Sequence, residues 1–220
     1  AAETVLAALV PQVSALRFLD LCDARIAGAD CVVSRSGYTG EDGFEISAPA
    51  ASAEAIASRL LADPQVMMTG LGARDSLRLE AGLCLYGSDL DETTTPVEAA
   101  LEWTIPASRR SRGAREGGFP GFATILAQFE TGASRRRVGL RPDGRAPIRR
   151  GARLFPDIQS NEAIGAVTSG GFGPSVDAPV AMGYVQTQHG ADAALFAELR
   201  GERVPVRIAR LPFINPRYKR

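Results

Sequence analysis

The sequence predicts an α+β protein in which an antiparallel-sheet half with helices is followed by a small antiparallel β-barrel domain. Up to about Ala107, helix-like and strand-like segments alternate along the chain, whereas short β-type runs dominate from about Arg135. Over residues 204–211, apolar side chains almost alternate with other residues, as they do in a strand with one buried face. A basic, glycine-containing stretch at 109–118 separates the two patterns and is predicted to be a surface linker.

The first half is predicted to contain amphipathic helices around a β-hairpin. Its helical segments place apolar residues on one side, and its hairpin is marked by a glycine-rich turn. In chain order we expect helices at 3–9 and 13–19, strands at 31–34 and 45–48, and helices at 51–61 and 71–81. A further helix should begin at Thr95, because Pro96 suits a first turn and Glu98 completes a capping box. Trp103 follows this apolar helix and is expected in the core.

The start of the chain predicts that the first half is incomplete. The helical pattern begins at Ala1, and no Ser, Thr, Asp or Asn precedes it to cap the helix. We therefore expect the same protein to contain earlier sequence and its sheet to gain strands from there.

The second half is predicted to open with a short helix at 119–129 and to continue as strands. Turns containing proline, glycine or aspartate separate the β-type runs at the spacing of a small antiparallel barrel or sandwich. The basic run at 135–137 is expected to contact the preceding domain. The expected strands lie at 137–140, 164–168, 180–185, 194–199 and 204–211. We divide the chain into a first domain at 1–112, a connecting segment at 113–134 and the barrel domain at 135–220.

Composition narrows the classes of partner. The 25 basic and 25 acidic residues balance, so no net electrostatic field favours nucleic acid or an anionic membrane. No apolar run approaches the ~20 residues that span a bilayer.

The three cysteines are widely spaced and form no C-x-x-C pair, which is typical of small buried residues in a reducing compartment. His189 is the one histidine, and no cysteine lies near it, so we predict no metal site.

The segment 34–47, SRSGYTGEDGFEIS, is the candidate for a binding site. Three glycines mark a turn, and Glu45 then stands between the apolar residues Phe44 and Ile46. In a strand this alternation puts Glu45 on the face opposite its neighbours, towards a cavity or water. The ring of Tyr38 in the turn could cover a planar ligand. The alternative is an ordinary surface hairpin with a solvated Glu45.

Arg74 is unusual because a cation at the start of a helix opposes the helix dipole. A charge-assisted pair with a carboxylate would compensate, since the guanidinium offers a planar fork to such a group. Glu45, Asp75 and Glu80 are the candidate partners. A structural ion pair and a ligand-binding role both remain open for Arg74 on this reasoning.

The hairpin and the blocks after it resemble the glycine cleavage system T proteins, which are aminomethyltransferases. The resemblance extends from the first residue to the last, and the blocks occur in the family's order. They are GLGARDSLRLEAGLCLYGSDLDETTTPVEAALEWT, RRRVGL, TSG, GPS, AMGYV and LPFI with a late tyrosine. So many ordered matches favour the functional interpretation of the hairpin.

The resemblance implies a fold and a reaction. The first domain would be part of a folate-binding region, and the barrel would be the family's C-terminal domain. The reaction implied is transfer of a one-carbon unit from the aminomethyl-lipoyl arm of the glycine cleavage H protein to tetrahydrofolate, with release of ammonia. Tetrahydrofolate is then a cosubstrate, and no metal, nucleic acid or membrane is expected to take part. The expected location is the cytoplasm, or the mitochondrial matrix in a eukaryote.

The resemblance also implies ligand contacts for Tyr38, Glu45, Arg74 and Tyr218. A carboxylate such as Glu45 could accept two adjacent N–H groups of a pterin. The family's catalytic aspartate lies upstream of the hairpin, and nothing before Ser34 matches its segment. We therefore assign no catalytic residue and expect this chain alone to be inactive or slow.

Two alternatives remain. One is the folate domain of a sarcosine- or dimethylglycine-type oxidoreductase, for which a dinucleotide-binding fingerprint in preceding sequence would be diagnostic. The other is a non-catalytic folate-binding relative, which absence of the catalytic aspartate from the full gene would favour.

Overall fold

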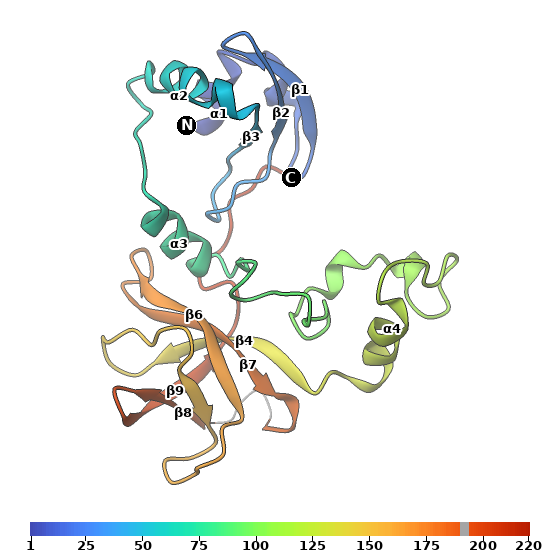
Figure 1. Cartoon of the computed structure of the whole chain (residues 1–220), viewed down its shortest axis with the longest axis vertical. Coiled ribbons are helices and arrows are strands. Elements are labelled where there is room, and N and C mark those ends of the chain that lie inside the picture. Colours follow the sequence, from blue (N-terminus) through green and yellow to red (C-terminus); the bar gives the residue numbers. More distant parts are fainter. Residues whose placement is uncertain (190–193) are drawn as a thin grey trace. The chain divides into compact units, whose positions relative to one another are not determined.

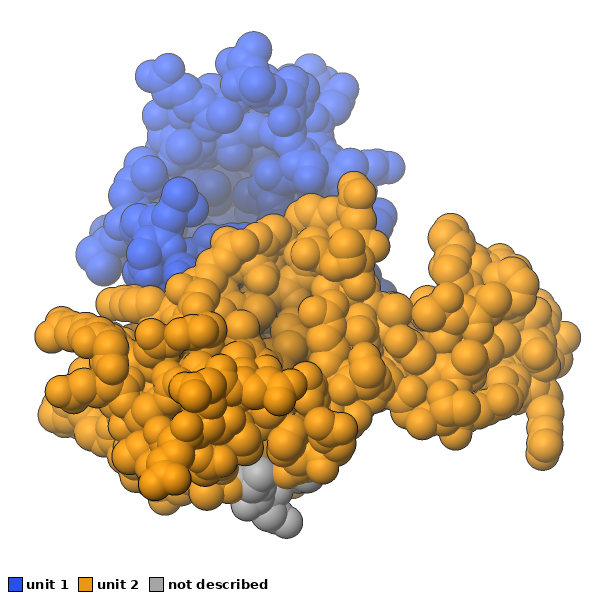
Figure 2. Space-filling view, turned by 60° about the horizontal axis from the view of Figure 1, so that its bottom comes forward, with its two compact units in different colours: residues 1–81, 214–220 blue, residues 82–213 orange. Residues whose placement is uncertain are grey.

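The computed structural model describes residues 1–189 and 194–220, which fall into two compact units. Unit 1 comprises Ala1–Ala81 together with Ile214–Arg220, and unit 2 comprises Gly82–Phe213 (Figure 1; Figure 2 colours the units separately). Within the described residues, no helix is both long enough and apolar enough to cross a membrane.

Unit 1 consists of an antiparallel sheet with helices beside one of its faces (Figure 1). Its strands pair in the order β1-β2-β3, and the buried core lies between the sheet and the helices α1 and α2. Leu6, Val13, Val33 and Ile56 belong to this core. The elements are α1 (Ala2–Ala7), the 3₁₀ helix η1 (Pro11–Ala15), β1 (Leu21–Ile26), β2 (Ala29–Ser34), β3 (Glu45–Ser47), η2 (Ala50–Ser52), α2 (Ala53–Leu61) and α3 (Leu71–Glu80).

The predicted hairpin is confirmed, but strand β1 was not predicted. In β1, Ala24 and Ile26 are buried while Asp23 and Arg25 are exposed, so the period-two signal is present. It is a weak signal because alanine is depleted in strands. The turn to β2 uses Ala27 and Gly28, both at positive φ (50° and 81°), as a type I′ turn requires. Because alanine occupies the first of these positions, the sequence lacks the Asn-Gly dipeptide that is typical of this turn.

Unit 2 contains a closed antiparallel barrel, which confirms the predicted fold of the second half. The strands follow one another around it in the order β4-β7-β6-β5-β8-β9, with Leu140, Val167 and Leu195 among the buried side chains inside. The strands are β4 (Arg135–Pro142), β5 (Arg153–Phe155), β6 (Gly165–Gly173), β7 (Ala178–Gln186), β8 (Ala194–Leu199) and β9 (Glu202–Ala209). The short β5 was not predicted, because three residues do not establish an alternation.

Before the barrel, unit 2 runs through turns and short helices. These are η3 (Glu102–Thr104), η4 (Ala107–Arg109) and α4 (Phe122–Thr131). A further 3₁₀ helix, η5 (Thr187–His189), follows β7.

The prediction of a helix from Thr95 is wrong, although the predicted capping box is present. The Thr95 N–H donates to Glu98 Oε2 at 2.9 Å, and the Glu98 N–H donates to Thr95 Oγ1 at 3.1 Å. The chain then forms successive turns and reaches a positive φ of 56° at Ala100.

Strand β4 explains why that helix does not continue. The carbonyl of Glu98, which a longer helix would use internally, instead accepts from the Arg137 N–H at 2.7 Å. Arg135 and Arg136 bind the carboxylates of Glu98 and Glu102 at 3.0 and 2.5 Å. The basic run was expected to contact the preceding domain; it does contact the segment before it, but that segment lies in the same compact unit, unit 2. Trp103, predicted in the core, is 70% exposed, because the helix that would have buried it is absent.

Candidate functional site

The hairpin between β2 and β3 is shaped by its glycines. Ser34 lies opposite Glu45 in the strand register, and the Gly37 N–H donates to the Gly43 carbonyl at 3.1 Å. A Cβ at Gly37 would collide with the Glu41 carbonyl oxygen, so only glycine fits there. The glycines thus fold 37–43 into a tight loop.

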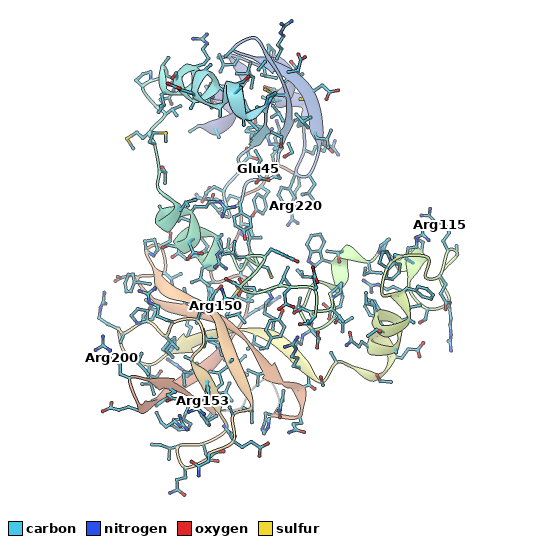
Figure 3. All side chains as sticks on the ribbon, in the orientation of Figure 1. Glu45, Arg115, Arg150, Arg153, Arg200 and Arg220 are labelled. Atoms are coloured by element: carbon cyan, nitrogen blue, oxygen red, sulfur yellow. The ribbon has the colours of Figure 1, made fainter. Side chains whose placement is uncertain are left out.

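Glu45 lies on the exposed face of β3 (Figure 3), whereas Phe44 and Ile46 pack against the core of unit 1. The sequence predicted this arrangement. Glu45 Oε2 accepts from Ser36 Oγ at 2.5 Å, and Ser36 Oγ is 2.8 Å from Ser34 Oγ. Hydroxyl groups from the first arm of the hairpin therefore orient the carboxylate on the second.

Arg74 and Tyr38 contact each other. The guanidinium carbon of Arg74 lies 4.4 Å from the centroid of the Tyr38 ring, a cation–π contact. The predicted ion pair between Arg74 and a carboxylate is not formed: among the described residues Arg74 has no ion pair, and the Asp75 carboxylate binds Arg78 at 2.6 Å instead. An aromatic ring can satisfy a cation while leaving the guanidinium N–H groups available to an acceptor.

Tyr218 is ordered although it lies close to the last residue described. Its ring stacks on Phe18 with centroids 4.1 Å apart and planes inclined by 15°. Backbone bonds on both sides fix it: the Arg217 N–H donates to the Gly40 carbonyl, and the Phe18 N–H donates to the Lys219 carbonyl, each at 2.8 Å. Burial raises the pKa of the Tyr218 hydroxyl.

The structure therefore places all four predicted residues in the hairpin or in segments that contact it. Tyr38 touches Arg74, and the segment bearing Tyr218 binds the hairpin at Gly40. Glu45 lies at the base of the hairpin's second arm. That all four residues surround one ligand stays a prediction.

Sequence reasoning missed Arg35, which is fully buried at 0% exposure. Its guanidinium forms paired bonds with the Asp42 carboxylate, one of them 2.8 Å long, and lies 5.0 Å from the Phe44 ring centroid. The signal was available in the alternation of β2: Cys31 and Val33 face the core, so Arg35 falls on the same side.

Within residues 1–189 and 194–220, no group of three or more His, Cys, Asp or Glu side chains could hold a metal ion. The site's chemistry is that of hydrogen-bond acceptors, a cation and aromatic rings.

Two family models match the sequence. One is described as the GCVT N-terminal domain and matches residues 1–109. The other is described as the glycine cleavage T-protein C-terminal barrel domain and matches residues 135–215.

Curated relatives and a solved structure agree with these matches. The chain is 44% identical over 218 residues to a probable mitochondrial aminomethyltransferase of Schizosaccharomyces pombe, covering 98% of this chain and 54% of the relative. It is 46% identical over 198 residues to the mitochondrial aminomethyltransferase of Solanum tuberosum, covering 88% and 47%. The crystal structure of the glycine cleavage system aminomethyltransferase T from Bartonella henselae superposes with a TM-score of 0.87 at 46% identity, covering 99% of this chain and 58% of that one. The chain thus spans about half the length of the curated relatives it matches.

Proposed function

The chain belongs to the glycine cleavage T-protein family, and on that premise we propose that it acts in tetrahydrofolate-dependent aminomethyl transfer. The reaction proposed is transfer of the one-carbon unit from the aminomethyl-lipoyl arm of the H protein to tetrahydrofolate, with release of ammonia. The observation that carries this proposal is the ordered hairpin, contacted within unit 1 by both Arg74 and the segment bearing Tyr218. The location proposed is the cytoplasm, or the mitochondrial matrix in a eukaryote.

Each proposed ligand residue has a distinct physical role. Glu45 would accept paired N–H donors from the pterin edge, and its orientation by Ser36 supports this role. Arg74, positioned by Tyr38, would supply donors to the ligand, and the rings of Tyr38 and Tyr218 would supply flat apolar surface. Orientation and electrostatics, rather than covalent chemistry by the protein, would be the contribution of these residues. No catalytic residue is assigned within the chain.

The domain division at 1–112, 113–134 and 135–220 is part of the same proposal, with tetrahydrofolate bound by the first domain and the lipoylated H protein as partner. The relatives reported above are aminomethyltransferases, which supports this function over the oxidoreductase domain and the non-catalytic relative. Ammonia release by the full-length protein that requires both tetrahydrofolate and lipoylated H protein would identify a transferase. Folate binding without release by the full-length protein would favour a non-catalytic relative, whereas this chain alone is expected to be inactive or slow.

Calorimetry with tetrahydrofolate tests the assignment of Glu45. Glu45→Gln keeps the shape but replaces one acceptor oxygen with a donor, so we expect binding to weaken by about 1–3 kcal/mol. Glu54→Gln, an exposed glutamate in the first turn of α2, is the matched control and should bind as the unaltered chain does. Equal affinity of the Glu45 variant and the unaltered chain would refute the role of Glu45.

A further inference from the structure

A buried charge network lies beneath the hairpin. Besides its bonds to Asp42, Arg35 donates from Nη2 to Glu3 Oε2 at 2.5 Å and from Nη1 to the carbonyls of Val13 and Leu16 at 3.3 and 3.1 Å. Arg35 therefore joins the hairpin to α1 and η1 through a side chain that is 0% exposed. Such a buried cation is stable only when its partners are present.

The network continues to the last residues of the chain. Glu3 also accepts from Lys219 Nζ, at 3.2 Å to Oε1 and 3.3 Å to Oε2, and Lys219 Nζ donates to the Ser14 carbonyl at 2.8 Å. The two cations Arg35 and Lys219 thus share the carboxylate of Glu3. Hydrogen bonds from both cations lower the pKa of Glu3, and the bond from Arg35 lowers it more than the bond from Lys219 does.

Tyr218 is held by charged neighbours on both sides. Arg217 binds Glu41 in the hairpin loop, with Nε 3.0 Å from Oε1, and Lys219 binds Glu3. The aromatic ring between them stacks on Phe18. Besides the backbone bonds to Gly40 and Phe18, side chains that do not themselves belong to the proposed ligand contacts therefore support its position relative to the hairpin.

We propose that Lys219 is a positioning residue for tetrahydrofolate: through Glu3 and the buried Arg35, its ammonium group fixes Tyr218 against the hairpin. This inference rests on the proposed function of the site. Lys219 and Glu3 are partly exposed, at 42% and 32% of their side chains, so removing the Lys219 cation leaves no buried charge unpaired. Arg35 keeps both of its carboxylates in that case. Loss of Lys219 should consequently affect the ligand more than the stability of the fold.

The test compares tetrahydrofolate affinity with thermal stability in the whole chain. For Lys219→Met we expect the Kd from calorimetry to rise about fivefold, the size of effect of one partly exposed ion pair, while the melting temperature changes by less than about 4 °C. Lys219→Arg keeps the cation and should restore the Kd to within about twofold. Arg220→Met makes the same charge change at the next, exposed residue (Figure 3) and should leave the Kd unchanged.

Amine labelling gives a second, ligand-independent measurement. Lys219 is the single lysine of the sequence, so an amine-reactive reagent modifies only Lys219 and the amino terminus. Glu3→Gln should increase the labelling rate of Lys219 several-fold, because the ammonium group loses its anionic partner. An unchanged rate would show that the network does not hold Lys219 and would overturn the proposal.

The outcomes separate the two proposals. If the unaltered chain does not bind tetrahydrofolate, the proposed function fails and the positioning role fails with it. If the unaltered chain binds and Lys219→Met binds equally well, the positioning role is wrong while the proposed function stands. A lower melting temperature with an unchanged Kd would show that Lys219 is purely structural.

Discussion

Arg35 shows how one residue can set the conformation of a loop, here the hairpin of the proposed ligand site. Transfer of a guanidinium from water to a protein interior costs several kcal/mol unless partners compensate it. Here the compensation comes from Asp42 within the hairpin and from Glu3 in α1, and the bonds to them raise the pKa of Arg35. The hairpin loop is consequently linked by charge to α1, and hydrogen bonds from Arg35 to the carbonyls of Val13 and Leu16 link it to η1.

Substituting Arg35 should destabilise unit 1 strongly. Arg35→Gln removes the partner of both carboxylates, and we expect a loss of up to about 3–5 kcal/mol in the free energy of unfolding, measured with urea. Arg25→Gln is the control, because Arg25 is 74% exposed and its pair with Asp30 is 4.0 Å long. That variant should change stability by no more than about 0.5 kcal/mol. A similar small change for Arg35→Gln would contradict the importance of the network.

The same residues predict a loss of stability in acid. Hydrogen bonds from Arg35 lower the pKa of both Asp42 and Glu3. Because these pKa values are lower in the folded chain, the stabilisation is complete above the usual carboxyl pKa of about 4 and is lost as pH falls through the depressed values. Melting temperatures measured from pH 6 downwards should fall more steeply for the unaltered chain than for Asp42→Asn. Parallel curves would argue against this linkage.

At the scale of elements, the hairpin loop depends on glycine where space is lacking. Gly37→Ala would place a Cβ against the Glu41 carbonyl, so we expect unit 1 to lose about 1–3 kcal/mol of stability by denaturant unfolding. Gly72→Ala is the counterpart: Gly72 lies within α3, and no heavy atom would lie within 4 Å of its new Cβ. Alanine favours a helix over glycine by up to ~1 kcal/mol, so this variant should be as stable or more stable. An equally harmless Gly37→Ala would mean that the loop can open.

Local patterns predicted most elements, and tertiary contacts explain the errors. The amphipathic helix α2 and the alternating strand β9 have strong periodic signals of their own. The segment after Thr95 has an equally clear helix start, but strand β4 takes the carbonyl of Glu98. A pattern of neighbouring residues cannot predict that β4 and a helix compete for this carbonyl, because Arg137 lies 39 residues further along the chain than Glu98.

At the scale of the whole molecule, unit 1 is discontinuous in sequence. Residues 214–220 return to it after the barrel has been completed, and they contact α1, the hairpin and the segment before β1. The candidate site is divided in the same way, because Tyr38, Glu45 and Arg74 lie within residues 1–81 whereas Tyr218 lies within residues 214–220. Motifs identified Tyr38, Glu45, Arg74 and Tyr218 individually, but the stacking of Tyr218 on Phe18 joins residues 200 positions apart and has no local signature.

Deleting residues 214–220 should therefore affect the two units differently. Hydrogen exchange should show faster exchange of the Phe18 amide, which loses its bond to the Lys219 carbonyl, and of the hairpin loop around Gly40. The barrel strands β4 to β9 lie wholly within unit 2 and should keep their protection. Uniform loss of protection in both units would show that they unfold together.

The bond between Glu3 and Lys219 joins residues 216 positions apart, and this has a consequence during translation. Domains generally fold as units while the chain is being made, starting from the amino terminus. All barrel strands are synthesised before residue 214, whereas helix α1, which is made before them, must wait for Lys219 to bind Glu3. The ribosome thus delivers a complete barrel before the hairpin receives its last contacts. A nascent chain should accordingly complete the Tyr218 side of the proposed ligand site only after its barrel strands have been made.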